Sequence, residues 1–259
     1  MNRIQKIFVK TLFVAAVPFT ISAGVLAVSK TYAASDTVSV IQRTAQKAEK
    51  AVLEAYASED PDVLKQEAEM PQNGIYDVML DSVCGPITYF NQSDARWGGY
   101  LYGGRDPIST YGCGPTVMAM LATSFTGRLI LPTETADWSA ANKGWCPGGG
   151  SYHRLIPDCA AAYGLKAAPL KDYSLEGIKG ALDSGYLVVA LMNKGHFTQA
   201  GHFIILTRIA EDGKLWLIDP NNYDNTKYGW DPEIILQELN HRATNGGPLW
   251  MVRPPDSPQ

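Results

Sequence analysis

The chain has 259 residues, of which 46% are hydrophobic and 19% charged, which suits one domain with a sizeable core plus an N-terminal extension. The formal net charge of −4, without any basic stripe, argues against a nucleic acid or an anionic membrane surface as partner. Four cysteines without a CxxC pair, no His/Cys/Asp/Glu cluster at metal-ligand spacing and no phosphate-binding glycine loop predict that no metal and no cofactor is used.

Residues 1–34 have the order of a signal peptide. Three basic residues come first, residues 11–28 are apolar, and small residues follow, with Ala33 or Ala34 as the expected cleavage point. The apolar run is longer than the usual core of a signal peptide, so an uncleaved membrane anchor is the alternative. Either way we expect the protein to be secreted or held at the cell surface. The segment carries four positive charges and no acid, so the rest of the chain carries −8.

Residues 35–74 are predicted to form a spacer with one polar helix. Its apolar stripe is small, and the acidic sequence of residues 59–62 breaks it. The stripe consists of Ile41, Ala45, Ala48, Val52 and Ala55. A spacer that holds the next domain away from the membrane or wall is the simpler interpretation, and a pro-segment that caps the active site is the alternative.

The domain proper is predicted to span residues 75–259, with helices first and strands second. We expect a short strand at 87–90, helices at 113–126, 134–142, 155–163 and 175–182, and a loop at 144–150. Apolar strands are expected at 187–191, 201–207, 215–219 and 249–252, with a further helix after Asp231 and Pro232. Helices followed by an antiparallel sheet predict an α+β fold.

The sequence Gly112-Cys113-Gly114-Pro115 is the strongest single signal. Pro115 suits the first turn of a helix, and a thiol at a helix N-terminus meets unpaired N–H groups that favour its thiolate. We interpret the two glycines as letting a substrate backbone approach. The alternative is a buried cysteine in a tight turn.

The other three cysteines can form at most one disulfide if Cys113 is a free nucleophile. These are Cys84, Cys146 and Cys159, and the pair we favour is Cys146 with Cys159.

A thiol nucleophile needs a base and a group that orients the base. His202 begins an apolar strand, and Asp219 ends the next one, so neighbouring strands would bring the two side chains together. The simpler interpretations are a core histidine and an aspartate that starts a turn. His196 lies in a loop and is an alternative substrate contact. His153 and His241 are read as surface residues.

An oxyanion also needs hydrogen-bond donors. The Cys113 backbone N–H is the first candidate, because helix N-terminal amides lack partners within the helix. Gln92 is the second, with Asn91 as the fallback.

These motifs together resemble the papain-like cysteine peptidases of the bacteriocin-processing (double-glycine leader) family, in the exported, stand-alone form. The resemblance rests on residues 92–97, 112–115, 201–203 and 217–220, and it extends from about residue 87 to 252. It implies a papain-like α+β fold and cleavage of peptide bonds. It also implies an oxyanion role for Gln92, a nucleophile at Cys113, a base at His202 and an orienting group at Asp219.

The sequence departs from the transporter-fused members of that family, because it has no transporter spans and no ATP-binding domain. The preference for a double-glycine leader is therefore not carried over. We expect a peptide or protein substrate, with contact to a membrane only through an uncleaved N-terminal segment. One alternative is a hydrolase of cell-wall peptides, suggested by loops rich in tyrosine and tryptophan: Trp97, Tyr100, Tyr102, Trp138 and Trp145. The other is a binding module without activity.

Overall fold

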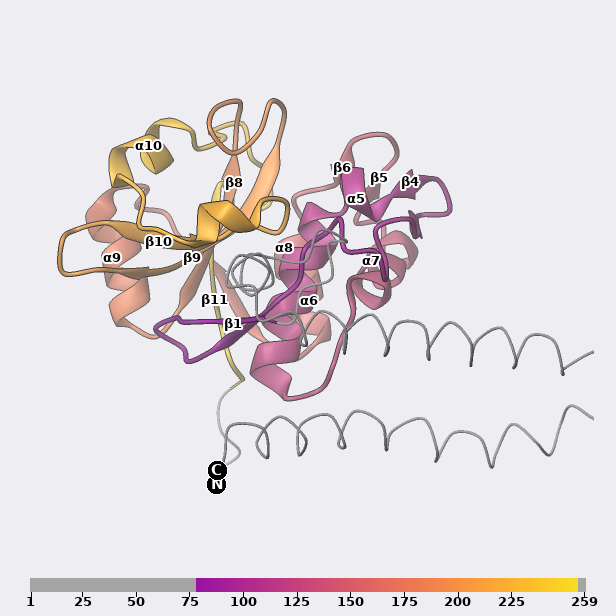
Figure 1. The fold of residues 1–259 in the computed structure, drawn as a ribbon, viewed down its shortest axis with the longest axis horizontal. Coiled ribbons are helices and arrows are strands. Elements are labelled where there is room, and N and C mark those ends of the chain that lie inside the picture. Colours follow the sequence, from indigo (N-terminus) through magenta and orange to yellow (C-terminus); the bar gives the residue numbers. More distant parts are fainter. Residues whose placement is uncertain (1–77, 256–259) are drawn as a thin grey trace, which may run out of the picture. The chain divides into compact units, whose positions relative to one another are not determined.

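The computed structural model describes residues 78–255 (Figure 1). The predicted signal segment at 1–34 and the predicted spacer at 35–74 lie outside the described residues. Within 78–255, no helix is both long and apolar enough to cross a membrane.

The centre of the domain is a five-stranded antiparallel sheet with the strand order β10-β9-β8-β11-β7. The predicted α+β fold is confirmed. The strands are β7 (Lys166–Pro169), β8 (Leu187–Met192), β9 (His202–Ile209), β10 (Leu215–Ile218) and β11 (Leu249–Arg253). Short two-stranded sheets pair β1 (Val78–Leu80) with β2 (Ile87–Tyr89), β3 (Leu101–Tyr102) with β4 (Asp106–Pro107), and β5 (Trp145–Cys146) with β6 (Gly150–Ser151).

Helices cover both faces of this sheet, which explains why its middle strand β8 is apolar without interruption (Figure 1). Successive residues of a strand point to opposite faces. In β8, Val189 packs into the core beneath the N-terminal helices, while its neighbour Val188 packs into a second core on the other face. The N-terminal helices are α5 (Ile108–Tyr111), α6 (Cys113–Thr126), α7 (Pro132–Ala141) and α8 (Leu155–Ala162), and those on the other face are α9 (Leu175–Asp183) and α10 (Pro232–Gln237).

Helix α6 forms the middle of the first core. Nine of its residues are buried, and Gly127 ends it in the left-handed conformation (φ 69°), with its N–H donated to the Thr123 carbonyl. Glycine is favoured there because it adopts positive φ without steric cost. The predicted helix boundaries are therefore confirmed, and Cys113 is the first helical residue.

The two glycines beside Cys113 have a packing role within the protein that the sequence did not indicate. A Cβ atom on Gly112 would lie 2.5 Å from the Ile108 side chain, and one on Gly114 would lie 2.8 Å from Leu155. Both distances are shorter than a carbon contact allows. The glycines let α5 and α8 approach the start of α6, and this fixes where the thiol lies.

The expected Cys146–Cys159 disulfide is wrong, because all four thiols are free. Cys159 lies in α8 and is fully buried in the core, whereas Cys146 lies in the β5–β6 hairpin. That hairpin occupies the segment predicted as a loop. Strand β7 was also not predicted, since Lys-Ala-Ala-Pro has neither an apolar alternation nor β-branched residues.

Candidate active site

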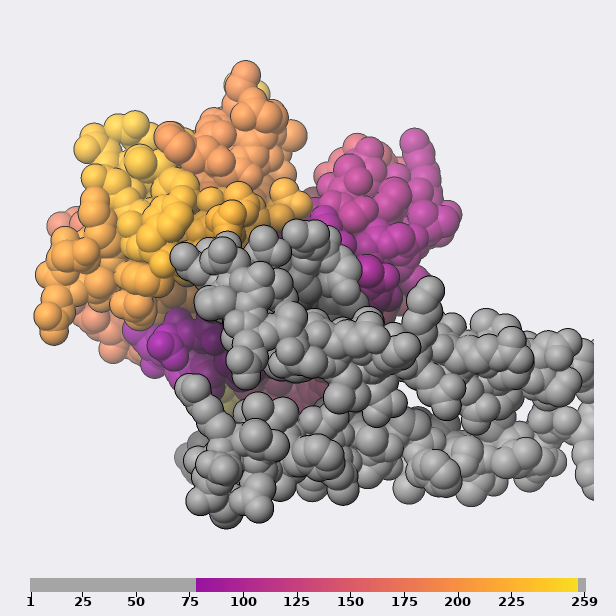
Figure 2. Space-filling view, in the orientation of Figure 1, coloured from indigo at the N-terminus to yellow at the C-terminus, as the bar shows by residue number. Residues whose placement is uncertain are grey.

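The surface is notched between the orange and yellow part, which holds the sheet, and the magenta part of the helical layer (Figure 2). Residues from both parts line a cavity of about 330 Å³. They are Gln92, Ser109, Thr110, Cys113, Phe197, Thr198, Gln199, Gly201, His202 and Asn221. Three of the four predicted site residues therefore share one cavity, and the fourth, Asp219, contacts His202 directly.

Cys113 is half-buried at the N-terminus of α6. Burial alone would raise the pKa of its thiol. The hydrogen bond with His202, the positive charge of that imidazole and the backbone groups of Phe203 and Gly114 outweigh burial and hold the pKa of Cys113 below its usual value. A thiol with a lowered pKa is a better nucleophile at neutral pH.

His202 is the first residue of β9, where it pairs with Met192 of β8, and it is only 5% exposed. Its Nε2–H donates to Asp219 Oδ1 over 2.7 Å, because an ionised carboxylate can only accept. Burial of the ring would lower its pKa. The hydrogen bonds and negative charges of Asp219 and Cys113 prevail and raise the pKa of His202 well above its usual value.

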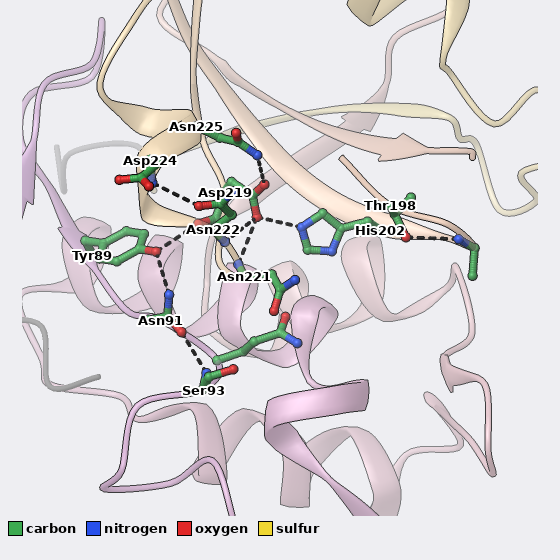
Figure 3. Close-up of polar contacts among 12 residues, drawn as sticks. Tyr89, Asn91, Ser93, Thr198, His202, Asp219, Asn221, Asn222, Asp224 and Asn225 are labelled. Atoms are coloured by element: carbon green, nitrogen blue, oxygen red, sulfur yellow. Dashed lines mark hydrogen bonds and ion pairs between the residues drawn. The ribbon is translucent and has the colours of Figure 1, made fainter. Parts of the chain in front are cut away.

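Asp219 follows β10 and is fully buried, and its side chain accepts four hydrogen bonds (Figure 3). Besides His202 Nε2, its Oδ1 accepts from the backbone N–H groups of Asn221 (2.8 Å) and Asn222 (3.2 Å). Its Oδ2 accepts from Asn225 Nδ2 at 2.7 Å. Burial would raise the pKa of the carboxyl, but these donors lower it, so Asp219 stays ionised beside the imidazole.

Gln92 is 3% exposed, and two contacts fix its position. Its backbone N–H donates to the Pro220 carbonyl at 2.7 Å, and its Nε2 donates to the Ser109 carbonyl at 2.8 Å. The second contact orients the amide, because the side-chain oxygen could not face a carbonyl. A primary amide has two N–H groups, so Nε2 retains one for a ligand in the cavity.

Asn91, the fallback oxyanion donor, does not line the cavity and bonds to neighbouring protein groups instead. Its Nδ2 donates to Tyr89 Oη at 3.1 Å and its Oδ1 accepts from the Ser93 N–H at 2.8 Å (Figure 3). Tyr89 in turn donates to the Asp219 carbonyl at 2.9 Å. Asn91 therefore ties the Gln92 loop to the Asp219 loop.

None of the other three histidines lines the cavity. His153 accepts the Thr244 N–H at 2.9 Å, and His241 is exposed. His196 is held by Glu238 on the loop that leads to His202. Among the aromatic residues that suggested a wall-binding surface, Trp97 and Tyr102 are buried. They stabilise the core and are not available to a polymer.

Two neighbours of the site were missed from the sequence. Asn225 lies in the short 3₁₀ turn η1 (Tyr223–Thr226), and its side chain holds the far oxygen of Asp219. The only signal was a run of asparagines after Asp219. Residues 197–199 line the cavity, but nothing in their sequence distinguishes them from an ordinary loop.

Comparison with known proteins identifies the family. No curated protein matches the chain. A crystal structure from Bacillus anthracis, assigned as a C39-like peptidase, matches with 17% identity and a TM-score of 0.41, over 55% of this chain and 88% of that one. The sequence profile of the peptidase C39-like family matches residues 86–242, a range that contains Gln92, Cys113, His202 and Asp219. This match covers more than half of the sequence, and the chain belongs to the peptidase C39-like family.

Proposed function

We propose that the protein is an exported cysteine peptidase that cleaves peptide bonds through Cys113, His202 and Asp219. The observation that carries this proposal is that Cys113, His202 and Gln92 line one cavity and that His202 bonds to the fully buried Asp219 at 2.7 Å. Membership of the peptidase family supports a peptide substrate. The basic, apolar and small-residue order of residues 1–34 supports secretion or attachment at the cell surface.

In the proposed reaction, the Cys113 thiolate attacks the carbonyl carbon of the scissile bond. The negative charge moves to the carbonyl oxygen, where the Cys113 N–H and the second N–H of Gln92 Nε2 stabilise it. The His202 imidazolium gives its proton to the leaving amine, and a thioester remains on Cys113. Neutral His202 then removes a proton from water, which attacks the thioester and releases the acid and the thiolate.

The test of the nucleophile is alkylation with limiting iodoacetamide across pH, read by mass spectrometry. We expect Cys113 to be modified selectively well below pH ~8, because its pKa is lowered while burial raises that of Cys84 and Cys159. The other three thiols serve as internal controls. If Cys113 reacts no faster than they do in the folded protein, the proposal fails and a binding module without activity becomes the better account.

Replacing Gln92 with alanine is expected to lower kcat by about 10²- to 10³-fold, because one oxyanion donor is lost. Alkylation of Cys113 by iodoacetamide should change little, since displacement of iodide forms no oxyanion. Gln237→Ala is the matched control, because Gln237 lies exposed on α10, outside the cavity, with its side chain bonded to Glu233. A fall in the alkylation rate that parallels the fall in kcat would contradict the oxyanion role.

A further inference from the structure

The loop between β8 and β9, residues 193–201, forms one wall of the candidate active site. Phe197, Thr198, Gln199 and Gly201 line the cavity together with Gln92 and Ser109, and His202 follows directly in the chain. In Figure 1 this orange loop projects beyond the end of the sheet near the label β8. A peptide that reaches Cys113 must therefore pass along it.

One carboxylate holds this loop in place. Glu238 Oε2 accepts the backbone N–H of His196 at 2.8 Å, and its Oε1 contacts His196 Nδ1. The Glu238 carbonyl accepts the N–H of Asn193 at 2.7 Å. The Glu238 side chain is only 13% exposed, so water competes little for the carboxylate, and a charged acceptor makes a stronger hydrogen bond than a neutral one.

The loop sequence leaves room for this contact. A Cβ atom on Gly195 would lie 2.0 Å from the Glu238 carboxyl carbon, so only glycine lets the carboxylate approach. The Gly195 N–H donates to the Thr198 carbonyl at 2.8 Å and closes a turn. The position of the cavity-lining Thr198 is thereby linked to the Glu238 contact.

Glu238 itself is attached to the central sheet. It follows α10, and the next two residues run beside the end of β8: Leu239 forms a bridge with Met192, and the Asn240 N–H donates to Leu191 at 2.9 Å. Because Glu238 is fixed beside the buried strand β8, its carboxylate holds the β8–β9 loop at a defined position relative to that strand.

A second contact completes the support. Phe197 is buried with its ring 4.6 Å from that of Trp230, and Trp230 Nε1 donates to the Asn225 carbonyl at 2.9 Å. Asn225 also binds Asp219. The Phe197 end of the loop thus packs against the same segment that orients His202. The His196 ring also lies 6.0 Å from that of Trp230, while the hydrogen bonds at the His196 end come from Glu238.

We propose that Glu238 is a positioning residue that holds the β8–β9 loop as a recognition wall for the peptide, without taking part in activating the thiol. Its kinetic effect rests on the peptidase function proposed above. Removing the carboxylate should loosen residues 195–199 while leaving the contacts of Cys113, His202 and Asp219 intact.

The test compares Glu238→Ala with Glu233→Ala, a matched control on the exposed side of α10 whose carboxylate accepts a hydrogen bond from Gln237. Three reagents that alkylate Cys113 are used on the full chain: iodoacetamide, acetyl-Ala-Ala chloromethyl ketone and N-iodoacetyl-Ala-Ala amide. The two peptide reagents extend to opposite sides of the reactive carbon. Hydrogen exchange of residues 193–201 is followed by mass spectrometry in parallel.

In Glu238→Ala we expect the rate with at least one peptide reagent to fall about tenfold, while iodoacetamide stays within about twofold. Exchange of the His196 and Gly195 amides should rise. His196→Ala should have a smaller effect than Glu238→Ala, because the backbone N–H that binds Oε2 remains. Glu233→Ala should match the wild type in every measurement.

Unchanged exchange in Glu238→Ala would overturn the support of the loop, whether or not the protein is a peptidase. Faster exchange with unchanged peptide-reagent rates would overturn the role in recognition. An equal loss with all three reagents would instead make Glu238 a support of the thiol. If iodoacetamide shows no preference for Cys113 in the wild type, the proposed function fails, while exchange still decides whether Glu238 holds the loop.

Discussion

Replacing His202 with alanine is expected to lower kcat/KM for peptide hydrolysis by at least about 10³-fold. The imidazole has two tasks in the proposed reaction. As the imidazolium it keeps Cys113 ionised and then protonates the leaving amine, and as the neutral ring it activates water. No other described titratable side chain lines the cavity besides Cys113, so no group there can replace it.

The pH dependence makes this prediction specific. In the wild type the pKa of Cys113 is lowered and that of His202 is raised, so the thiolate–imidazolium pair exists between the two values. The rate should rise as Cys113 loses its proton and fall as His202 loses its own, giving a bell-shaped profile. Without His202, burial becomes the dominant influence and raises the pKa of Cys113. Iodoacetamide labelling should then increase only at alkaline pH.

This result is checked by measuring kcat/KM for peptide hydrolysis and the rate of iodoacetamide labelling across pH, with two controls. Cys113→Ala should show no turnover and no labelling at that position. His241→Ala is the matched histidine control, because His241 is exposed, does not line the cavity, and has its ring 6.0 Å from that of Tyr173. Near-normal turnover of His202→Ala with an unchanged profile would remove His202 from the mechanism.

The predicted site residues that the structure brings together are those whose sequence signals are local. A cysteine at the start of a helix, a histidine that opens an apolar strand and an aspartate that ends the next strand can each be recognised from a few neighbours. His202 and Asp219 come together because β9 and β10 are consecutive in the chain and pair as neighbours in the sheet. An antiparallel pair joined by a short turn is the simplest connection a sheet can make.

The parts that were missed depend on contacts between distant segments. Strand β7 exists because it pairs with β11 at the end of the domain, and its own four residues carry no strand pattern. Glu238 matters because the chain after α10 runs beside β8. Gly112 and Gly114 were recognised from the sequence. The close packing of α5 and α8 against them cannot be predicted from the local sequence.

Replacing Asp219 with alanine is expected to lower both activity and stability, with a loss of about 10²-fold in kcat/KM and about 3 kcal/mol in unfolding free energy. The substitution leaves the donors of His202, Asn221, Asn222 and Asn225 without their acceptor in a buried place. The activity loss should remain smaller than that of Cys113→Ala, because Asp219 orients the base and does not react. Thermal unfolding must accompany the kinetics so that the two losses are separated.

The substitution Asp219→Asn distinguishes the orienting role of residue 219 on the His202 ring from the effect of its negative charge. The asparagine Oδ1 can still accept from His202 Nε2 and from the Asn221 N–H, so the ring stays in place. Its Nδ2 would face Asn225 Nδ2, a conflict that rotation of the Asn225 amide relieves. We expect a loss of only about tenfold in kcat/KM, since one charged hydrogen bond becomes neutral.

The charge itself should be visible in the pH profile of Asp219→Asn. Asp219 helps to raise the pKa of His202, so its neutral replacement lowers that pKa, and the alkaline limb of the bell should move to lower pH. The acid limb, which reports the thiol, should move less, because Asp219 acts on Cys113 only through His202. If folded Asp219→Ala loses as much activity as Cys113→Ala, Asp219 does more than orient His202. If the alkaline limb of Asp219→Asn stays in place, Asp219 is not the group that raises the pKa of His202.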